Sequence, residues 1–139
     1  MKTILVAVSL FLSSVAYAAN PYDYRVIRVL DGDTVEIDAP FLPVELRQTL
    51  RLRIIDVDTP EKGSLAKCQN ERDRAEAATR FTRTQIAKAK KHQIVLVKWD
   101  KYGGRVLGDV LLDGKSLKQM LLENFHAYPY DGGKKRSWC

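Results

Sequence analysis

Residues 50–61 read LRLRIIDVDTPE, a run in which a regular apolar pattern passes into a group of acidic residues. From Leu50 to Ile54 an aliphatic residue alternates with arginine, which is the period-two pattern of a strand with one face buried and the other in water. Pro60 ends the strand because proline has no amide hydrogen to donate. The stretch therefore predicts a strand over residues 50–57 that leads into a cluster of acidic side chains.

Four further strands are expected, over residues 24–30, 34–37, 93–99 and 105–112. They are rich in aliphatic residues, and Gly, Pro and Asp separate the early ones. The last two join through residues 100–104, whose paired glycines suit a tight hairpin connection.

Two helices are predicted beside these strands. From about Glu71 to Lys91 the chain contains neither Gly nor Pro and is rich in alanine, and Asn70 can cap this helix. Ser116 can cap a second helix that runs to about Phe125. Five strands, with one helix between the third and fourth and another after the fifth, indicate an α+β protein: a five-stranded OB-fold β-barrel with flanking α-helices.

The first residues read as a secretory signal peptide over residues 1–18 rather than as structure. Lys2 precedes an apolar run over residues 4–15, and residues 16–18 have the small-residue pattern of a cleavage site. The run is shorter than the roughly 20 apolar residues that span a bilayer, so no membrane association is expected once the signal is removed. We expect one mature domain over residues 19–139, either secreted or periplasmic.

Charge and cysteine content are compatible with an exported protein that meets an anionic partner. Lys2 is the only charged residue of the signal, so the mature chain keeps a net charge of +5, one below the +6 of the full sequence. Such a balance favours nucleic acid without identifying it. In an oxidising compartment Cys68 and Cys139 could pair, and two free thiols are the alternative.

Two acidic clusters stand at the edges of otherwise apolar strands, one over residues 31–33 and one over residues 56–61. A hard cation such as calcium needs several oxygen ligands, and carboxylates from two adjacent loops can supply them. For residues 31–33 taken alone, an ordinary turn is the alternative.

Two arginines accompany these clusters. Arg53 precedes the second cluster, and Arg105 starts the strand after the glycine pair. Hydrolysis of a phosphodiester needs positive charge at the phosphate oxygens, and a planar guanidinium can bind two of them at once. For either arginine alone, a surface ion pair is the alternative.

Three motifs then occur in order: VLDGDTV at residues 29–35, LRIIDVDTPE at 52–61 and DKYGGR at 100–105. Together they resemble the staphylococcal nuclease (thermonuclease) family over residues 26–130. The resemblance implies a calcium-dependent phosphodiesterase that hydrolyses DNA and RNA with little sequence specificity, favours single strands and leaves 3'-phosphate ends.

The resemblance also implies roles for individual residues. Calcium would be held by the carboxylates of Asp33 and Asp58 and by the backbone carbonyl of Thr59. Glu61 would be the general base, and Arg53 and Arg105 would stabilise the phosphorus centre and the leaving oxygen. The substrate's terminal phosphate and bases would be bound by Lys101, Tyr102, Tyr128 and Tyr130, since aromatic faces accept any base.

Two other functions remain open from the sequence. A non-catalytic OB-fold module could bind nucleic acid, but acidic clusters on its binding face would oppose binding unless a cation lay among them. An exported inhibitor or adhesion domain could use calcium only to stiffen a loop, but this function would not explain why Arg53 and Arg105 accompany the acidic clusters. No protein partner is indicated.

Overall fold

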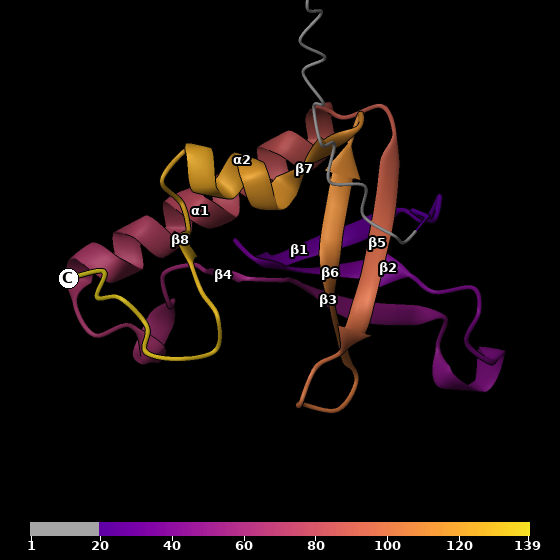
Figure 1. Cartoon of the computed structure of the whole chain (residues 1–139), viewed down its shortest axis with the longest axis horizontal. Coiled ribbons are helices and arrows are strands. Elements are labelled where there is room, and N and C mark those ends of the chain that lie inside the picture. The colour runs from indigo at the N-terminus through magenta and orange to yellow at the C-terminus, as the bar shows by residue number, and fades with distance from the viewer. Residues whose placement is uncertain (1–19) are drawn as a thin grey trace, which may run out of the picture.

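A computed structural model describes residues 20–139 (Figure 1). The signal peptide expected over residues 1–18 lies outside the described residues and stays a prediction. Within the described part of the chain, no helix is long and apolar enough to cross a membrane.

The architecture is a curled sheet with two helices packed beside it (Figure 1). The strands are β1 Val26–Asp31, β2 Thr34–Asp38, β3 Thr49–Ile54, β4 Val57–Asp58, β5 His92–Trp99, β6 Arg105–Leu112, β7 Lys115–Ser116 and β8 Tyr128–Pro129. The helices are α1 Gln69–Lys88 and α2 Leu117–Glu123, with short 3-10 turns at Val44–Leu46 and Gly63–Leu65.

The main sheet has the strand order β1-β2-β3-β6-β5, with β7 paired to β6. Neighbours are antiparallel except β3 and β6, which run parallel. Tyr22 and Ile94 exchange two backbone hydrogen bonds of 2.8 Å, so the segment before β1 reaches β5 at the far end of the sheet and curls it. The five predicted strands and the OB-fold architecture are therefore confirmed.

The alternation in residues 50–54 places one face of β3 in the core. Leu50, Leu52 and Ile54 are buried, Arg51 is exposed and Arg53 is partly exposed. The core that this face joins also includes Val35, Ile37, Ile94, Val110, Leu117 and Leu121. Burial of one side of an alternating strand is what keeps the arginine side of β3 on the outside.

The predicted strand over residues 50–57 is wrong in one respect, because it breaks at Ile55 and Asp56 into β3 and β4. Asp56 has φ 63°, a left-handed conformation that Asp tolerates better than most residues. Ile55 donates its amide hydrogen to the Gly108 carbonyl oxygen at 2.8 Å, which binds the turn to β6. After this break the chain leaves the main sheet, and β4 pairs with β8 instead.

The cap of α1 also differs from the prediction. The capping side chain is Cys68, whose Sγ accepts a hydrogen bond from the Glu71 amide at 3.4 Å. Asn70 instead lies in the first helical turn and donates its side-chain amide to the Trp138 carbonyl oxygen at 2.8 Å. The helix begins earlier than expected and ends at Lys88. The cap predicted for α2 is confirmed, because the Ser116 hydroxyl accepts from the Gln119 amide.

Candidate active site

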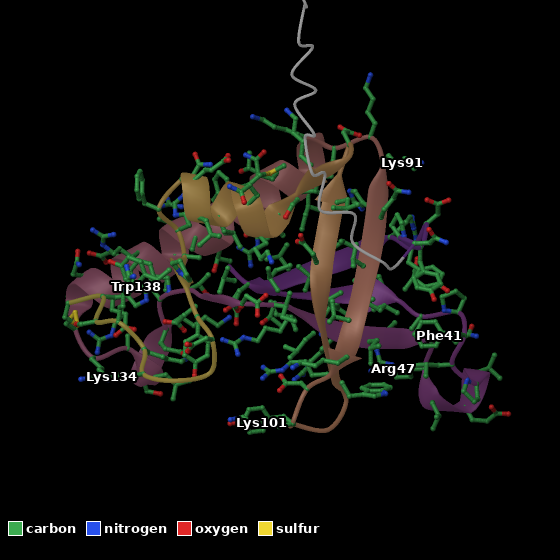
Figure 2. The ribbon with its side chains drawn as sticks, viewed as in Figure 1. Phe41, Arg47, Lys91, Lys101, Lys134 and Trp138 are labelled. Carbon is green, nitrogen blue, oxygen red and sulfur yellow. A yellow bond between two sulfur atoms is a disulfide. The ribbon has the colours of Figure 1, made fainter. Side chains whose placement is uncertain are left out.

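A cleft of about 740 Å³ lies between the β5–β6 loop, the β1–β2 turn, the segment after β3 and the C-terminal tail. The tail here means residues 131–139. Figure 2 labels Lys101 on the loop, and Lys134 and Trp138 on the tail. The cleft is lined by most of the predicted site residues: Asp33, Arg53, Thr59, Glu61, Lys101, Tyr102, Arg105 and Tyr130.

The β1–β2 turn presents two carboxylates to the cleft. Asp33 is buried and accepts a hydrogen bond from the Thr34 hydroxyl at 3.0 Å, and its backbone amide donates to Asp31 Oδ1 at 3.2 Å. Asp31, which belongs to the first acidic cluster but was not named as an individual ligand, also lines the cleft. Burial and the neighbouring charge of Asp33 raise the pKa of Asp31 to about 7. Ionising Asp31 beside Asp33 is therefore costly unless a positive charge lies close to the turn.

Helix α1 holds this turn in place. The Thr82 hydroxyl donates to the Gly32 carbonyl oxygen at 2.7 Å, and both groups are buried. A Cβ at position 32 would lie 2.8 Å from the Ala78 Cβ, so only glycine allows the helix to approach this closely. The spacing of the two aspartates thus depends on a helix that begins 36 residues after Asp33.

Arg53 reaches the same turn from β3. Its Nε lies 3.5 Å from Asp33 Oδ2, and the side chain is about one-fifth exposed. Arg51, two residues earlier, is exposed and does not line the cleft. The structure therefore brings Arg53, and not Arg51, beside the acidic turn.

Arg105 begins β6, the strand beside β3, and lies with the aromatic part of the β5–β6 loop. Its Nε pairs with Asp100 Oδ2, and its guanidinium lies 5.2 Å from the centre of the Tyr102 ring. Lys101 Nζ lies 5.3 Å from the same ring. Burial would raise the pKa of Asp100, but the hydrogen bond and charge of Arg105, together with backbone hydrogen bonds from Lys101 and Tyr102, hold the pKa below the ordinary value. Asp100 thus orients Arg105, and Tyr102 lies close to two cations.

A hydrogen bond to Glu71 fixes the backbone of Glu61, while the Glu61 carboxylate stays accessible to solvent. The Glu61 amide donates to Glu71 Oε1 at 3.2 Å, and the Lys67 amide donates to Glu71 Oε2 at 2.7 Å. Glu71 is buried, whereas the Glu61 side chain is 44% exposed. An accessible carboxylate on a fixed backbone can accept a proton from water at a set position.

The tail closes the cleft and reaches Asp58. Cys139 forms a disulfide with Cys68, which brings the end of the chain to the start of α1 (Figures 1 and 2). Trp138 is buried, and its Nε1 donates to Asp58 Oδ2 at 3.3 Å. Lys135 Nζ lies 3.0 Å from Asp58 Oδ1 and 3.4 Å from Glu61 Oε1. Burial would lower the pKa of Lys135, but the two carboxylates outweigh burial and raise it.

The structure does not place Asp58 and Tyr128 on the wall of the main cleft. Asp58 lines a neighbouring groove, which shares Glu61 and Lys135 with the cleft. The Tyr128 ring stacks on Trp138 with ring centres 3.9 Å apart, and the Arg136 guanidinium lies 5.3 Å from its centre. Tyr128 is therefore engaged by the tail, and its predicted role in base stacking stays a prediction.

The oxygen donors around the acidic turn suit a hard cation. Asp31 and Asp33 present adjacent carboxylates whose mutual repulsion a cation would relieve, and buried Thr59 lies on the same wall. Among residues 20–139, no three Asp, Glu, His or Cys side chains form a cluster that could hold a metal ion. A bound cation would therefore need backbone, water or substrate oxygens as well.

Comparison with known proteins assigns the chain to a family. Residues 51–136 match the family model described as staphylococcal nuclease homologue. The chain belongs to the staphylococcal nuclease family. It is 31% identical over 108 residues to an Escherichia coli protein named "Uncharacterized endonuclease", covering 77% of this chain and 60% of that protein. It is 38% identical over 65 residues to a Shigella flexneri "Micrococcal nuclease", covering 45% of this chain and 32% of that protein. The chain thus spans about 60% of the length of the first of these relatives.

The family match covers only part of the site. It includes Arg53, Glu61 and Arg105 but begins after Asp31 and Asp33 and ends before Trp138. Sequence reasoning missed Asp31, Glu71, Asp100 and Lys135. Asp31 belongs to a quoted motif, so its signal was present. For Lys135 the sequence offered only an indirect signal: pairing of Cys139 with Cys68 would bring the tail that carries Lys135 near residue 61.

Replacement of Glu71 by glutamine is expected to destabilise this nuclease-family protein by about 2 kcal/mol, because an amide group would then face one of the two partly buried backbone N–H donors. The free energy of unfolding in urea measures the change. Glu76→Gln, an exposed change on the same helix, is the matched control and should stay within about 0.5 kcal/mol of the wild type. Equal stability of the two variants would show that Glu71 does not hold the Glu61 loop.

Proposed function

We propose that this protein is an exported, calcium-dependent nuclease that hydrolyses phosphodiester bonds in DNA and RNA with little sequence specificity and leaves 3'-phosphate ends. The observation that carries the proposal is the content of the cleft. Arg53, Arg105 and Glu61 line the same cleft as the acidic turn with Asp31 and Asp33. This combination suits a reaction in which negative charge builds on phosphate oxygens while water is activated.

Each side chain has a chemical task in that reaction. The half-exposed Glu61 carboxylate accepts a proton from the attacking water. Arg53, in contact with Asp33, and Arg105, in contact with Asp100, place positive charge where the phosphate oxygens gain negative charge.

Substrate binding falls to the β5–β6 loop. Tyr102 is exposed and can stack on an unpaired base, and Lys101 can pair with a phosphate. Neither contact reads the base identity, which supports low sequence specificity and a preference for single strands. Tyr130 lines the opposite wall and can contribute a second aromatic face.

Calcium would be held by Asp33 and Asp58 with the carbonyl of Thr59, and it would supply positive charge that stabilises the charge on a phosphate oxygen and makes the attacking water more acidic. Asp31, which shares the turn with Asp33, adds a further carboxylate nearby. The raised pKa of Asp31 and the closeness of Asp33 support the choice of a divalent cation, which would stabilise both carboxylates in their ionised form.

Export is proposed from two features of the chain. Residues 1–18 have the pattern of a signal peptide. Cys68 and Cys139 form a disulfide, which persists in oxidising compartments such as the periplasm or the medium.

The proposal is tested by incubating the purified protein with labelled single-stranded DNA and RNA, with calcium or with excess chelator. We expect cutting with calcium, loss of cutting with chelator and recovery when calcium is restored. Sensitivity of the products to a 3'-phosphatase identifies their ends. Tight binding without cutting under any divalent metal would contradict the proposal and favour a non-catalytic OB-fold module.

A further inference from the structure

The amine of Lys135 lies between two carboxylates that have other partners in the proposed reaction: calcium for Asp58 and the attacking water for Glu61. Lys135 Nζ lies 3.0 Å from Asp58 Oδ1, a proposed calcium ligand, and 3.4 Å from Glu61 Oε1, the proposed base. Asp58 is buried and Glu61 is half-exposed, so the amine bridges the inner and outer parts of the site. The single positive charge of Lys135 thus lies where calcium is expected to bind.

The tail that carries Lys135 is anchored on both sides of it. Before it, the Tyr130 amide donates to the Asp56 carbonyl oxygen at 2.9 Å, next to the pairing of β8 with β4. After it, buried Trp138 donates to Asp58, and Cys139 is bonded to Cys68. A tethered amine has a high effective concentration at its partner, so it competes with ions in solution far better than free ammonium would.

Lys135 can nevertheless leave without unpacking the tail. Its side chain is 43% exposed, whereas the anchoring contacts belong to Tyr130, Trp138 and Cys139. The amine also lines both the main cleft and the neighbouring groove, so space exists for it on either side.

We infer that Lys135 is a built-in counter-ion that competes with calcium for Asp58 and so sets the calcium affinity of the site. This inference rests on the calcium role proposed above. An ammonium group and a divalent cation repel each other strongly at one carboxylate oxygen, so calcium binds Asp58 only in molecules whose Lys135 has moved away. The apparent affinity for calcium is the intrinsic affinity multiplied by the fraction of molecules in which Lys135 has left Asp58.

The test is a calcium titration by isothermal calorimetry on the purified oxidised chain without nucleic acid. Lys135→Gln removes the ion pairs of the half-exposed amine with buried Asp58 and half-exposed Glu61, and it is expected to tighten calcium binding about tenfold. Lys135→Arg keeps the charge and is expected to bind calcium as weakly as the wild type. Lys134→Gln removes the same charge one residue away, where the structure shows no ion pair with residues 20–139, and should change the affinity much less.

The outcomes separate the inference from the proposed function. Unchanged affinity in Lys135→Gln, or equal tightening in Lys134→Gln, overturns the inference. Absence of calcium binding in all four proteins overturns it together with the calcium role. The expected order of affinities without any cleavage of nucleic acid would support the counter-ion role of Lys135 and contradict the nuclease proposal alone.

Discussion

Replacing Arg53 by lysine is expected to lower kcat on single-stranded DNA by about a hundredfold or more, with little change in KM. Lysine keeps the positive charge but loses the planar fork that holds two phosphate oxygens and the Nε that faces Asp33 Oδ2 at 3.5 Å. The lost contacts matter most when charge builds on the phosphate, so the effect falls on the chemical step. Steady-state kinetics with saturating calcium measures it.

Arg51 provides the matched control for this change. It lies on the same strand two residues earlier, is exposed and does not line the cleft. Arg51→Lys should therefore leave kcat within about twofold of the wild type, as expected of a surface arginine. An equal loss in the two variants would indicate a general effect of charge or stability, and an unchanged kcat in Arg53→Lys would remove Arg53 from the reaction.

Replacing Glu61 by glutamine is expected to lower kcat by about 10²- to 10⁴-fold, the range that positioned general bases contribute. Glutamine has nearly the same shape, and the backbone bond from residue 61 to Glu71 can remain. The amide, however, cannot accept a proton from water. Nuclease assays at saturating calcium measure the loss.

Two controls accompany the Glu61 variant. Glu76→Gln removes one carboxylate from an exposed helical position and should leave kcat unchanged. Calcium affinity must also be measured in Glu61→Gln, because the change breaks the 3.4 Å pair with Lys135. Full activity at saturating calcium would show that Glu61 is not the base and that another group activates water.

The main elements of the fold were predictable because burial leaves a periodic trace in the sequence. Alternation in residues 50–54 predicted which face of β3 is buried, and the structure agrees. The break at Asp56 was not predictable from periodicity, since aliphatic residues stand on both sides of it, Ile54 and Ile55 before it and Val57 after it. It depends on β6, whose Gly108 carbonyl accepts the Ile55 amide.

The cap of α1 shows a second limit. Asn70 has the better capping side chain by intrinsic preference, yet Cys68 takes that position. The disulfide places Cys68 at the helix start, and Trp138 takes the Asn70 amide as a partner through its carbonyl oxygen. Tertiary contacts with the tail therefore overrode a local preference.

The strands, both helices and the segments that carry Arg53, Glu61 and Arg105 could be predicted from the sequence, because each depends on residues close together in the chain. Tertiary packing alone brings Lys135 to Glu61, 74 residues away, and Trp138 to Asp58, 80 residues away. Such contacts depend on how the tail packs after the disulfide closes. The physical reason is that local burial repeats along a chain and can be read from it, whereas a contact made by one tethered side chain leaves no repeat.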